Sequence, residues 1–245
     1  MLNILFIPEI ILSIGVMIII LFDLFFQKQK GLSFTLVQFL LLIAAYYSLN
    51  NKFSPSYSAY TLNEFTNVFK FILLVGSLAI FHYTYKHLKF LKILKIEYFT
   101  ISLLGLIGTM IMISANSLLM LYLGIELLSL SLYALIGFNK KSSLSSEAAI
   151  KYYVLGAMSS GILLFGISLI YGFTGSIAYD DIASQLINID MNSVDYIAII
   201  FGIIFITASL CFKFGAAPFH MWVPDIYQGS LISTTILLST LPKIA

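Results

Sequence analysis

The chain has 245 residues, of which 60% are hydrophobic and only 10% are charged, and its formal net charge is +2. A mean hydropathy of +1.01 excludes a soluble globular enzyme or a soluble binding domain. We expect no nucleic-acid partner, because the lysines stand in loops next to apolar runs. The composition therefore predicts an all-α, polytopic membrane protein, and the length allows roughly seven to nine helical crossings.

Apolar segments of membrane-spanning length follow one another along the chain. Almost no loop separates the fourth from the fifth, which predicts a tight antiparallel pair. The eighth has about fifteen residues before the last one, too few to cross a bilayer, so we expect it to continue on another polypeptide or in a longer chain. The eight segments cover residues 4–26, 32–49, 65–85, 98–114, 117–138, 148–172, 196–222 and 230 onward.

These segments predict a transmembrane bundle of about eight helices. Residues 1–97 would hold three N-terminal transmembrane helices, and residues 98–245 would hold helices four to eight, the last one incomplete. The connection 175–195 is the longest, and its apolar residues 182–187 predict partial order at the outer surface. We expect residues 224–229, which begin with a proline and end with a glycine, to form a turn between helices seven and eight.

The seventh segment carries a lysine and is then interrupted. A lysine at the centre of a membrane helix costs roughly 2.5 to 3.5 kcal/mol, so Lys213 needs a partner or a water-filled interior. Gly215 and Pro218 weaken and then break the helix just after it. Because non-helical backbone at this depth must be packed in protein or line a cavity, the seventh helix is predicted to be discontinuous and to face a polar path.

A carboxylate lies near the middle of the fifth segment. Helical spacing places Tyr122, Glu126, Ser129 and Tyr133 on one face, which therefore points into the protein. Glu126 is either a helix-packing carboxyl or a proton-binding group. Lys213 supplies a buried charge of opposite sign, and if the two side chains approach each other, each changes the proton affinity of the other. This pair is the leading candidate for a proton switch.

Three more residues are candidates for a proton relay, and each also has a purely structural interpretation. His220 follows Lys213 by seven residues, and it is either a hydrogen-bonded packing residue or a proton relay. Lys243 lies at mid-membrane depth in the eighth segment, as a relay or as a lysine that reaches an interface. Lys151 follows Glu147 by four residues, the spacing of a surface ion pair on a helix. We read Glu9, near the start of the first segment, as interfacial.

Lysine accounts for all thirteen basic residues, which is typical of an AT-rich genome such as that of an organelle. The N-terminus has no transit-peptide character. Eight lysines lie in the loops after segments one, three and five, against one in the loops after segments two and six. By the positive-inside rule, the N-terminus faces away from the compartment of synthesis. No CxxC motif or dinucleotide glycine pattern is present, so this chain is expected to hold no iron–sulfur cluster, flavin, nicotinamide or metal.

Four motifs, at residues 123–130, 147–161, 171–175 and 212–229, together resemble a known family, the antiporter-like membrane subunits of respiratory complex I. One departure is Leu231, where the family usually has a proline. The similarity extends over essentially the whole chain. Within the family, the sequence is most similar to NADH dehydrogenase subunit 2 of the mitochondrial and proteobacterial type, N-terminal half only.

The resemblance implies proton translocation. Glu126 would be the carboxylate of helix five, Lys213 the lysine of the broken helix seven and Lys243 the relay lysine of helix eight, with His220 in the connecting path. Lys151 completes this set of candidate relay residues. Helices four to eight would be the first of two inverted antiporter-like repeats, and the second has no counterpart in this chain.

The resemblance also implies an enzyme complex, an NADH:ubiquinone reductase, in which this chain does no redox catalysis. NADH, FMN, iron–sulfur clusters and ubiquinone would belong to partner subunits. The partners would be other complex I membrane subunits, a chain or segment with the second repeat, and lipids such as cardiolipin. The location would be the mitochondrial inner membrane, with the N-terminus toward the intermembrane space. The alternatives are a cation/proton antiporter subunit and a purely structural membrane subunit.

Overall fold

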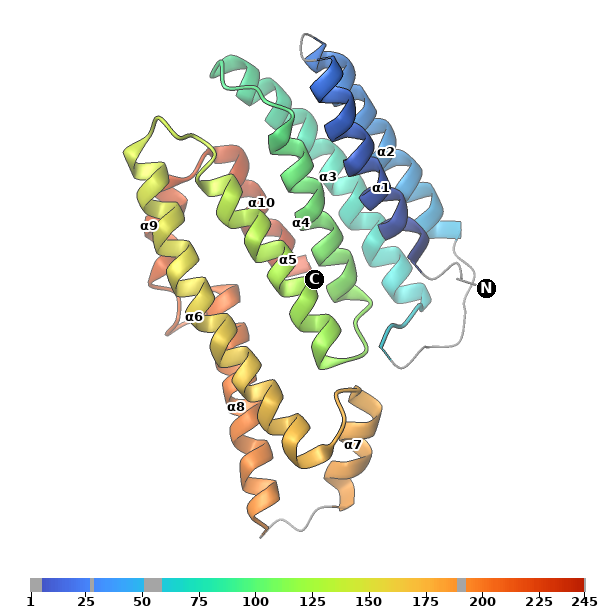
Figure 1. The fold of residues 1–245 in the computed structure, drawn as a ribbon, viewed down its shortest axis with the longest axis vertical. Coiled ribbons are helices and arrows are strands. Elements are labelled where there is room, and N and C mark those ends of the chain that lie inside the picture. Colours follow the sequence, from blue (N-terminus) through green and yellow to red (C-terminus); the bar gives the residue numbers. More distant parts are fainter. Residues whose placement is uncertain (1–5, 27–28, 51–58, 189–192, 245) are drawn as a thin grey trace.

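A computed structural model describes residues 6–26, 29–50, 59–188 and 193–244, and in these ranges the chain is built from ten helices (Figure 1). Two of the ten, α7 and α9, are short, and the other eight occupy the eight apolar segments. The helices are α1 (Ile7–Phe25), α2 (Lys30–Asn50), α3 (Glu64–Phe90), α4 (Glu97–Ile113), α5 (Leu118–Ile136), α6 (Ser143–Thr174), α7 (Tyr179–Asn188), α8 (Val194–Phe214), α9 (Trp222–Gly229) and α10 (Ile232–Ile244).

Six helices, α1, α2, α3, α5, α6 and α8, are long and apolar enough to cross a membrane. The helices α4 and α10 are also apolar but are shorter than these six. Helices are the natural solution for such segments, because they satisfy every backbone donor and acceptor within one element. The chain is a multi-pass membrane protein with an all-helical fold, which confirms the predicted fold class.

The helices α1 to α5 and α10 lie side by side, and α6 and α8 form a second group that extends past the end of the first (Figure 1). The most extensive packing joins α4 to α5, which confirms the predicted antiparallel pair. Cβ atoms would not fit at the closest approach, because one built on Gly108 would lie 2.8 Å from the carbonyl oxygen of Gly124. The second group is joined in the same way, by α6 against α8.

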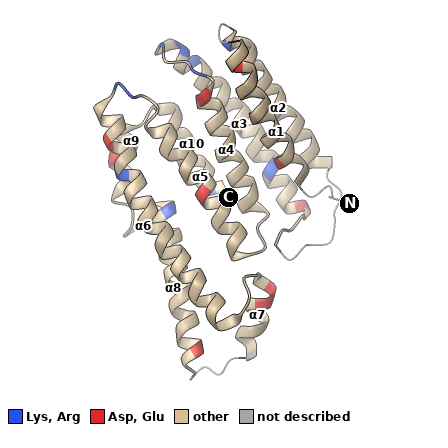
Figure 2. Cartoon of the chain, in the orientation of Figure 1, with Lys and Arg blue, Asp and Glu red and all other residues tan. Residues whose placement is uncertain are grey.

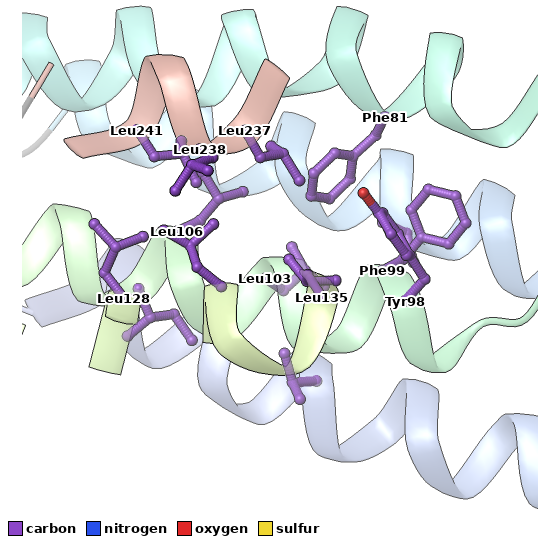
Figure 3. Packing of buried hydrophobic residues seen from close by; sticks show 14 of the residues in the cluster. Phe81, Tyr98, Phe99, Leu103, Leu106, Leu128, Leu135, Leu237, Leu238 and Leu241 are labelled. Atoms are coloured by element: carbon purple, nitrogen blue, oxygen red, sulfur yellow. The ribbon is translucent and has the colours of Figure 1, made fainter. Parts of the chain in front are cut away.

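Buried apolar side chains fill the centre of the first group, and those labelled in Figure 3 come from α3, α4, α5 and α10. Phe81 of α3 packs against Phe99 of α4, with ring centroids 5.6 Å apart. Leu103 of α4, Leu135 of α5 and Leu238 of α10 belong to the same cluster. This packing draws α10 into the bundle although it is the last helix of the chain.

The charged residues gather mainly at the helix ends (Figure 2). Exposed lysines Lys86, Lys89, Lys92 and Lys95 surround the connection between α3 and α4. The ammonium of Lys30, at the start of α2, donates a hydrogen bond of 2.9 Å to the carbonyl oxygen of Leu94. We name this lysine-rich end of the first group the basic edge, although Glu97 at the start of α4 also lies there.

The prediction of a turn at residues 224–229 is wrong, because these residues belong to helix α9. Pro224 lies in the first helical turn, where its missing N–H is not needed. Trp222 and Ile226 lie one helical turn apart and are both buried, so α9 has an apolar face to pack against the protein. The order expected at residues 182–187 is present as helix α7.

Candidate functional site

Helix α5 presents Glu126 from its middle. The helix begins after Ser117, whose hydroxyl accepts a hydrogen bond from the backbone N–H of Met120 and so caps the first turn. Gly124 lies at the contact with α4, and a Cβ there would lie 2.9 Å from the carbonyl oxygen of Gly108. The carboxylate of Glu126 points away from this contact and is 22% exposed.

Helix α8 presents Lys213 from its last turn. The helix ends because Gly215 adopts a left-handed conformation with φ of 67°, a conformation that favours glycine. The indole Nε1 of Trp222 donates a hydrogen bond of 3.0 Å to the carbonyl oxygen of Phe212 and ties α9 to the end of α8. A cation in the last turn also interacts favourably with the helix dipole. The predicted interruption of helix seven is thus the break between α8 and α9.

The side chains of Glu126 and Lys213 meet between α5, α6 and α8. The ammonium Nζ of Lys213 lies 3.7 Å from Oε1 of Glu126. It donates hydrogen bonds of 3.0 Å to the hydroxyl of Ser129 and 3.1 Å to that of Ser160. The hydroxyl of Ser160 in turn donates to Oε1 of Glu126. One serine therefore bridges the amine and the acid that the sequence singled out.

This geometry suits the movement of a proton better than permanent pairing. A separation of 3.7 Å is within the range of an ion pair but too long for a direct hydrogen bond. A hydroxyl both accepts and donates, so Ser160 can pass a proton between its two neighbours. Because the pair is largely buried, small changes in its separation change the electrostatic energy more than they would in water.

A cavity of about 30 Å³ lies beside this pair, lined in part by Ser129, Lys213 and Tyr152. It extends to Pro242, the residue before Lys243 on α10. Most of its other lining residues are apolar, among them Ile125, Leu128 and Leu210. A water molecule needs roughly 10 to 15 Å³ of such volume together with polar partners, so the cavity has the volume for water beside Ser129 and Lys213. The side chain of Lys243 itself is exposed at the last turn of α10.

Lys151 belongs to a different cluster. Its Nζ lies 2.9 Å from Oε1 of Glu147, which confirms the predicted ion pair, and 2.9 Å from Oδ2 of Asp225 on α9. The three side chains are about half exposed, so this cluster lies on the surface of the chain and links α6 to α9. His220 lies in the connection between α8 and α9 with its side chain exposed. The relay roles of Lys151, His220 and Lys243 stay predictions.

The sequence reasoning missed a second buried acid and amine. Lys70 of α3 lies 2.6 Å from Oε1 of Glu9 on α1, and these side chains are 1% and 5% exposed. The side chain of Glu9, which the sequence placed near a membrane interface, is therefore enclosed by protein. A lysine within an apolar segment was the available signal, because the argument that singled out Lys213 applies equally to Lys70.

Comparison with known proteins identifies the family of this chain. A sequence profile described as NADH:quinone oxidoreductase/Mrp antiporter, TM, matches residues 115–245. The NADH-quinone oxidoreductase subunit N of Ruthia magnifica subsp. Calyptogena magnifica is 42% identical over 243 residues, covering 97% of this chain and 50% of that protein. The chain spans about half the length of the curated relatives it matches.

Two solved structures share the fold. A chain of respiratory complex I from Thermus thermophilus with bound aureothin superposes with a TM-score of 0.76 at 25% identity, covering 97% of this chain and 51% of that one. A chain of the archaeal membrane-bound sulfane sulfur reductase, a respiratory membrane complex, gives a TM-score of 0.80 at 22% identity, covering 96% and 50%.

The relative from Ruthia magnifica and the subunit N of Hydrogenovibrio crunogenus, which is 38% identical over 245 residues, are both bacterial, so they do not support the narrower resemblance to a mitochondrial subunit 2. The profile covers more than half of the chain, including Glu126 and Lys213. The chain therefore belongs to the NADH:quinone oxidoreductase/Mrp antiporter transmembrane family.

Proposed function

We propose that this chain translocates protons as a membrane subunit of an NADH:quinone oxidoreductase complex. The observation that supports this most directly is the Glu126–Ser160–Lys213 arrangement, in which a buried acid and a buried amine share one hydroxyl. Buried ionisable groups within membrane helices are expensive and typically mark ion or proton paths. The name of the relatives, NADH-quinone oxidoreductase subunit N, supports the assignment to such a complex.

The proposed step is a proton transfer driven by the separation of Glu126 from Lys213. With the acid ionised and the amine protonated, the pair is neutral and each charge stabilises the other. When the pair separates, both charges lose this stabilisation in a medium of low dielectric constant. The proton of Lys213 then moves to water in the adjoining cavity and onward past Pro242 to Lys243. A proton supplied through Glu126 and Ser160 restores the pair.

The redox chemistry belongs to partner subunits in this proposal. NADH, FMN, iron–sulfur clusters and ubiquinone would be bound there, and other membrane subunits would transmit the energy to Glu126 and Lys213. The missing half of the relatives' length would supply the second inverted repeat, on this polypeptide or on another. The basic edge formed by the lysines between α3 and α4 would contact anionic lipids such as cardiolipin.

The most specific part of the proposal is the location, which is the mitochondrial inner membrane with the N-terminus toward the intermembrane space. Its support is the arginine-free composition, and the bacterial relatives add none. The lysine distribution supports the orientation in any energy-converting membrane, because the positive-inside rule depends only on the side of synthesis.

The test is proton translocation coupled to NADH oxidation in membrane vesicles that contain the assembled complex. We expect Glu126→Gln and Lys213→Met each to lower the number of protons moved per NADH, because each removes an acid–base group from the path. Lys140→Met, at an exposed lysine outside the helices, is the matched control and should leave translocation unchanged. Unaltered translocation in both site variants would leave only a structural role.

A second candidate function is cation/proton antiport, because the matching profile covers Mrp antiporters as well. The same vesicles separate the two functions. An antiporter subunit would exchange sodium or potassium for protons in the absence of NADH, whereas the proposed subunit moves protons only while electrons flow. Exchange that needs no NADH and is lost in Lys213→Met would favour the antiporter.

A further inference from the structure

The turn between α4 and α5 is held by the chain segment that precedes α3. The backbone N–H of Thr61 donates a hydrogen bond of 3.0 Å to the carbonyl oxygen of Ser114. The N–H of Asn116 donates one of 3.0 Å to the carbonyl oxygen of Ala59. Tyr60 lies between these two connections, so its position and that of the turn are linked.

The side chain of Tyr60 is itself fixed by the buried acid and amine of the first three helices. Its hydroxyl donates a hydrogen bond of 2.8 Å to Oε1 of Glu9 and accepts one of 2.5 Å from Nζ of Lys70. The Lys70 ammonium lies 2.6 Å from the same Glu9 oxygen. The phenol ring also packs against Phe6, with centroids 4.1 Å apart. We name Glu9, Tyr60 and Lys70 the anchor triad.

The anchor triad differs physically from the Glu126–Lys213 pair. Its acid and amine are in direct contact and almost fully enclosed, while Glu126 and Lys213 are 3.7 Å apart and partly open. Removing one partner from an enclosed ion pair is strongly destabilising because it leaves a buried charge uncompensated. The triad therefore suits a permanent attachment, and the looser pair suits a group that must rearrange.

Other charged groups leave the anchor triad undisturbed in the described part of the chain. The charges of α2 and α4, Lys30 and Glu97, both lie at the opposite end of the bundle. Glu64 lies at the near end in the first turn of α3, and its side chain is exposed. Ser114 is the polar neighbour from the end of α4. The net charge of the triad is thus zero when Glu9 is ionised and Lys70 is protonated.

The start of α5 governs where Glu126 lies. Ser117 caps the helix, and Glu126 follows nine residues later, about 13 Å along the helix axis. Helices in membranes associate mainly by close packing, without the strong hydrophobic driving force that acts in water. A polar attachment at a helix end can therefore decide the position of the whole helix along its axis.

We propose that Glu9, Tyr60 and Lys70 are positioning residues for α5, and that they set the distance between Glu126 and Lys213. This inference rests on the proposed function, in which that distance controls proton transfer. The anchor triad acts through the turn at residues 114–117, and within the described residues it makes no hydrogen bond or ion pair with Glu126, Ser160 or Lys213. It assigns to the three N-terminal helices a role in tuning the site.

The test uses the full-length protein in its assembled complex and two variants. Tyr60→Phe keeps the ring and removes only the hydroxyl, and the double variant Glu9→Gln/Lys70→Met removes both charges together, so that neither leaves an unpaired buried ion. Amide hydrogen exchange is measured at Thr61 and Asn116, whose N–H groups hold the turn. We expect exchange about tenfold faster in both variants, because local opening becomes easier when the attachment is weakened.

The second readout is the pH profile of proton translocation, which a merely structural role would not move. We expect its midpoint to shift in Tyr60→Phe and in the double variant, because the shared proton of Glu126 and Lys213 depends on their separation. Lys140→Met is the matched control, since it removes an exposed lysine beyond the other end of α5 and leaves the turn at residues 114–117 untouched. It should leave both readouts unchanged.

The outcomes separate this inference from the proposed function. Faster exchange with an unaltered pH profile would overturn the positioning role and leave a stabilising contact only. Unaltered exchange in both variants would overturn the anchor itself. Failure of the proposed function would be seen elsewhere, as unchanged translocation in Glu126→Gln, and the exchange measurement would still report on the anchor.

Discussion

The amine of Lys213 meets the carboxylate of Glu126 across the hydroxyl of Ser160, which accepts from the first and donates to the second. The three groups come from α8, α5 and α6, so no single helix determines the arrangement. This makes the bridge sensitive both to the serine itself and to the packing that brings the helices together.

Replacing Ser160 by alanine should slow proton transfer without preventing assembly. The variant removes the only group that hydrogen-bonds both charges among the described residues, and a positioned proton-transfer group typically contributes about a hundredfold or more. The measurement is the rate of proton translocation at constant electron flow. Ser159→Ala is the matched control, because that hydroxyl bonds Ser209 of α8 instead. Equal rates in the two variants would contradict a relay through Ser160.

Close packing of α6 against α8 should tolerate no added methyl group at Gly166. A Cβ there would lie 2.7 Å from the carbonyl oxygen of Gly202, so the helices must separate, at a cost of about 1 to 3 kcal/mol. Gly166→Ala should lower thermal stability and weaken the contact of Lys213 with Ser160. Gly161→Ala on the same helix has open space at its Cβ and should be neutral or slightly stabilising.

The glycine at the break after α8 allows backbone strain to be tested separately from steric contact of an added Cβ. Gly215 and Gly175 both have positive φ, 67° and 69°, so alanine strains the backbone at either position. Only at Gly215 would the new Cβ also meet a neighbour, Val223 at 2.7 Å. We expect Gly175→Ala to lose about 1 kcal/mol of stability through strain alone, and Gly215→Ala to lose more and also to reduce proton translocation. Thermal unfolding and vesicle assays of the two variants decide this.

Anionic lipid should bind at the connection between α3 and α4. Replacing Lys86, Lys89, Lys92 and Lys95 together by glutamine should lower the amount of cardiolipin that co-purifies with the complex, because each lysine near the membrane surface adds attraction. The effect should shrink as salt is raised. A matched double change, Lys140→Gln with Lys141→Gln, removes charge from another loop. If it lowers the lipid content as much, the binding is not specific to this edge.

The sequence predicted the fold well because membrane-spanning helices are encoded locally. Length and hydropathy are sufficient to find them, and an ionisable residue within them marks Glu126 and Lys213 as unusual. The pairing of these two residues is visible only in three dimensions, and Ser160 is one of many serines in the chain. Lys70 carried the same signal as Lys213 but lacked a nearby break, and its partner Glu9 stood close enough to a helix end to look interfacial.

The short helix α9 shows the limit of reading turns from residue type. Proline and glycine at the two ends of residues 224–229 favoured a turn, yet both fit a helix at those positions. The decisive contribution comes from elsewhere in the chain. A Cβ on Gly229 would lie 2.5 Å from that of Ala148, so α9 rests directly on α6, and Lys151 binds Asp225 across the same contact.

That contact connects the surface charge cluster to the interior of the protein through α6. Lys151 and Ser160 lie on the same helix, nine residues and about 13 Å apart, with the charge cluster at the surface and the bridging hydroxyl inside. Because an α-helix is a stiff element, a displacement of one of its residues also moves the residues farther along it. A displacement of α9 that draws Lys151 away from Asp225 would therefore be felt along α6 at Ser160, which bridges the acid and the amine.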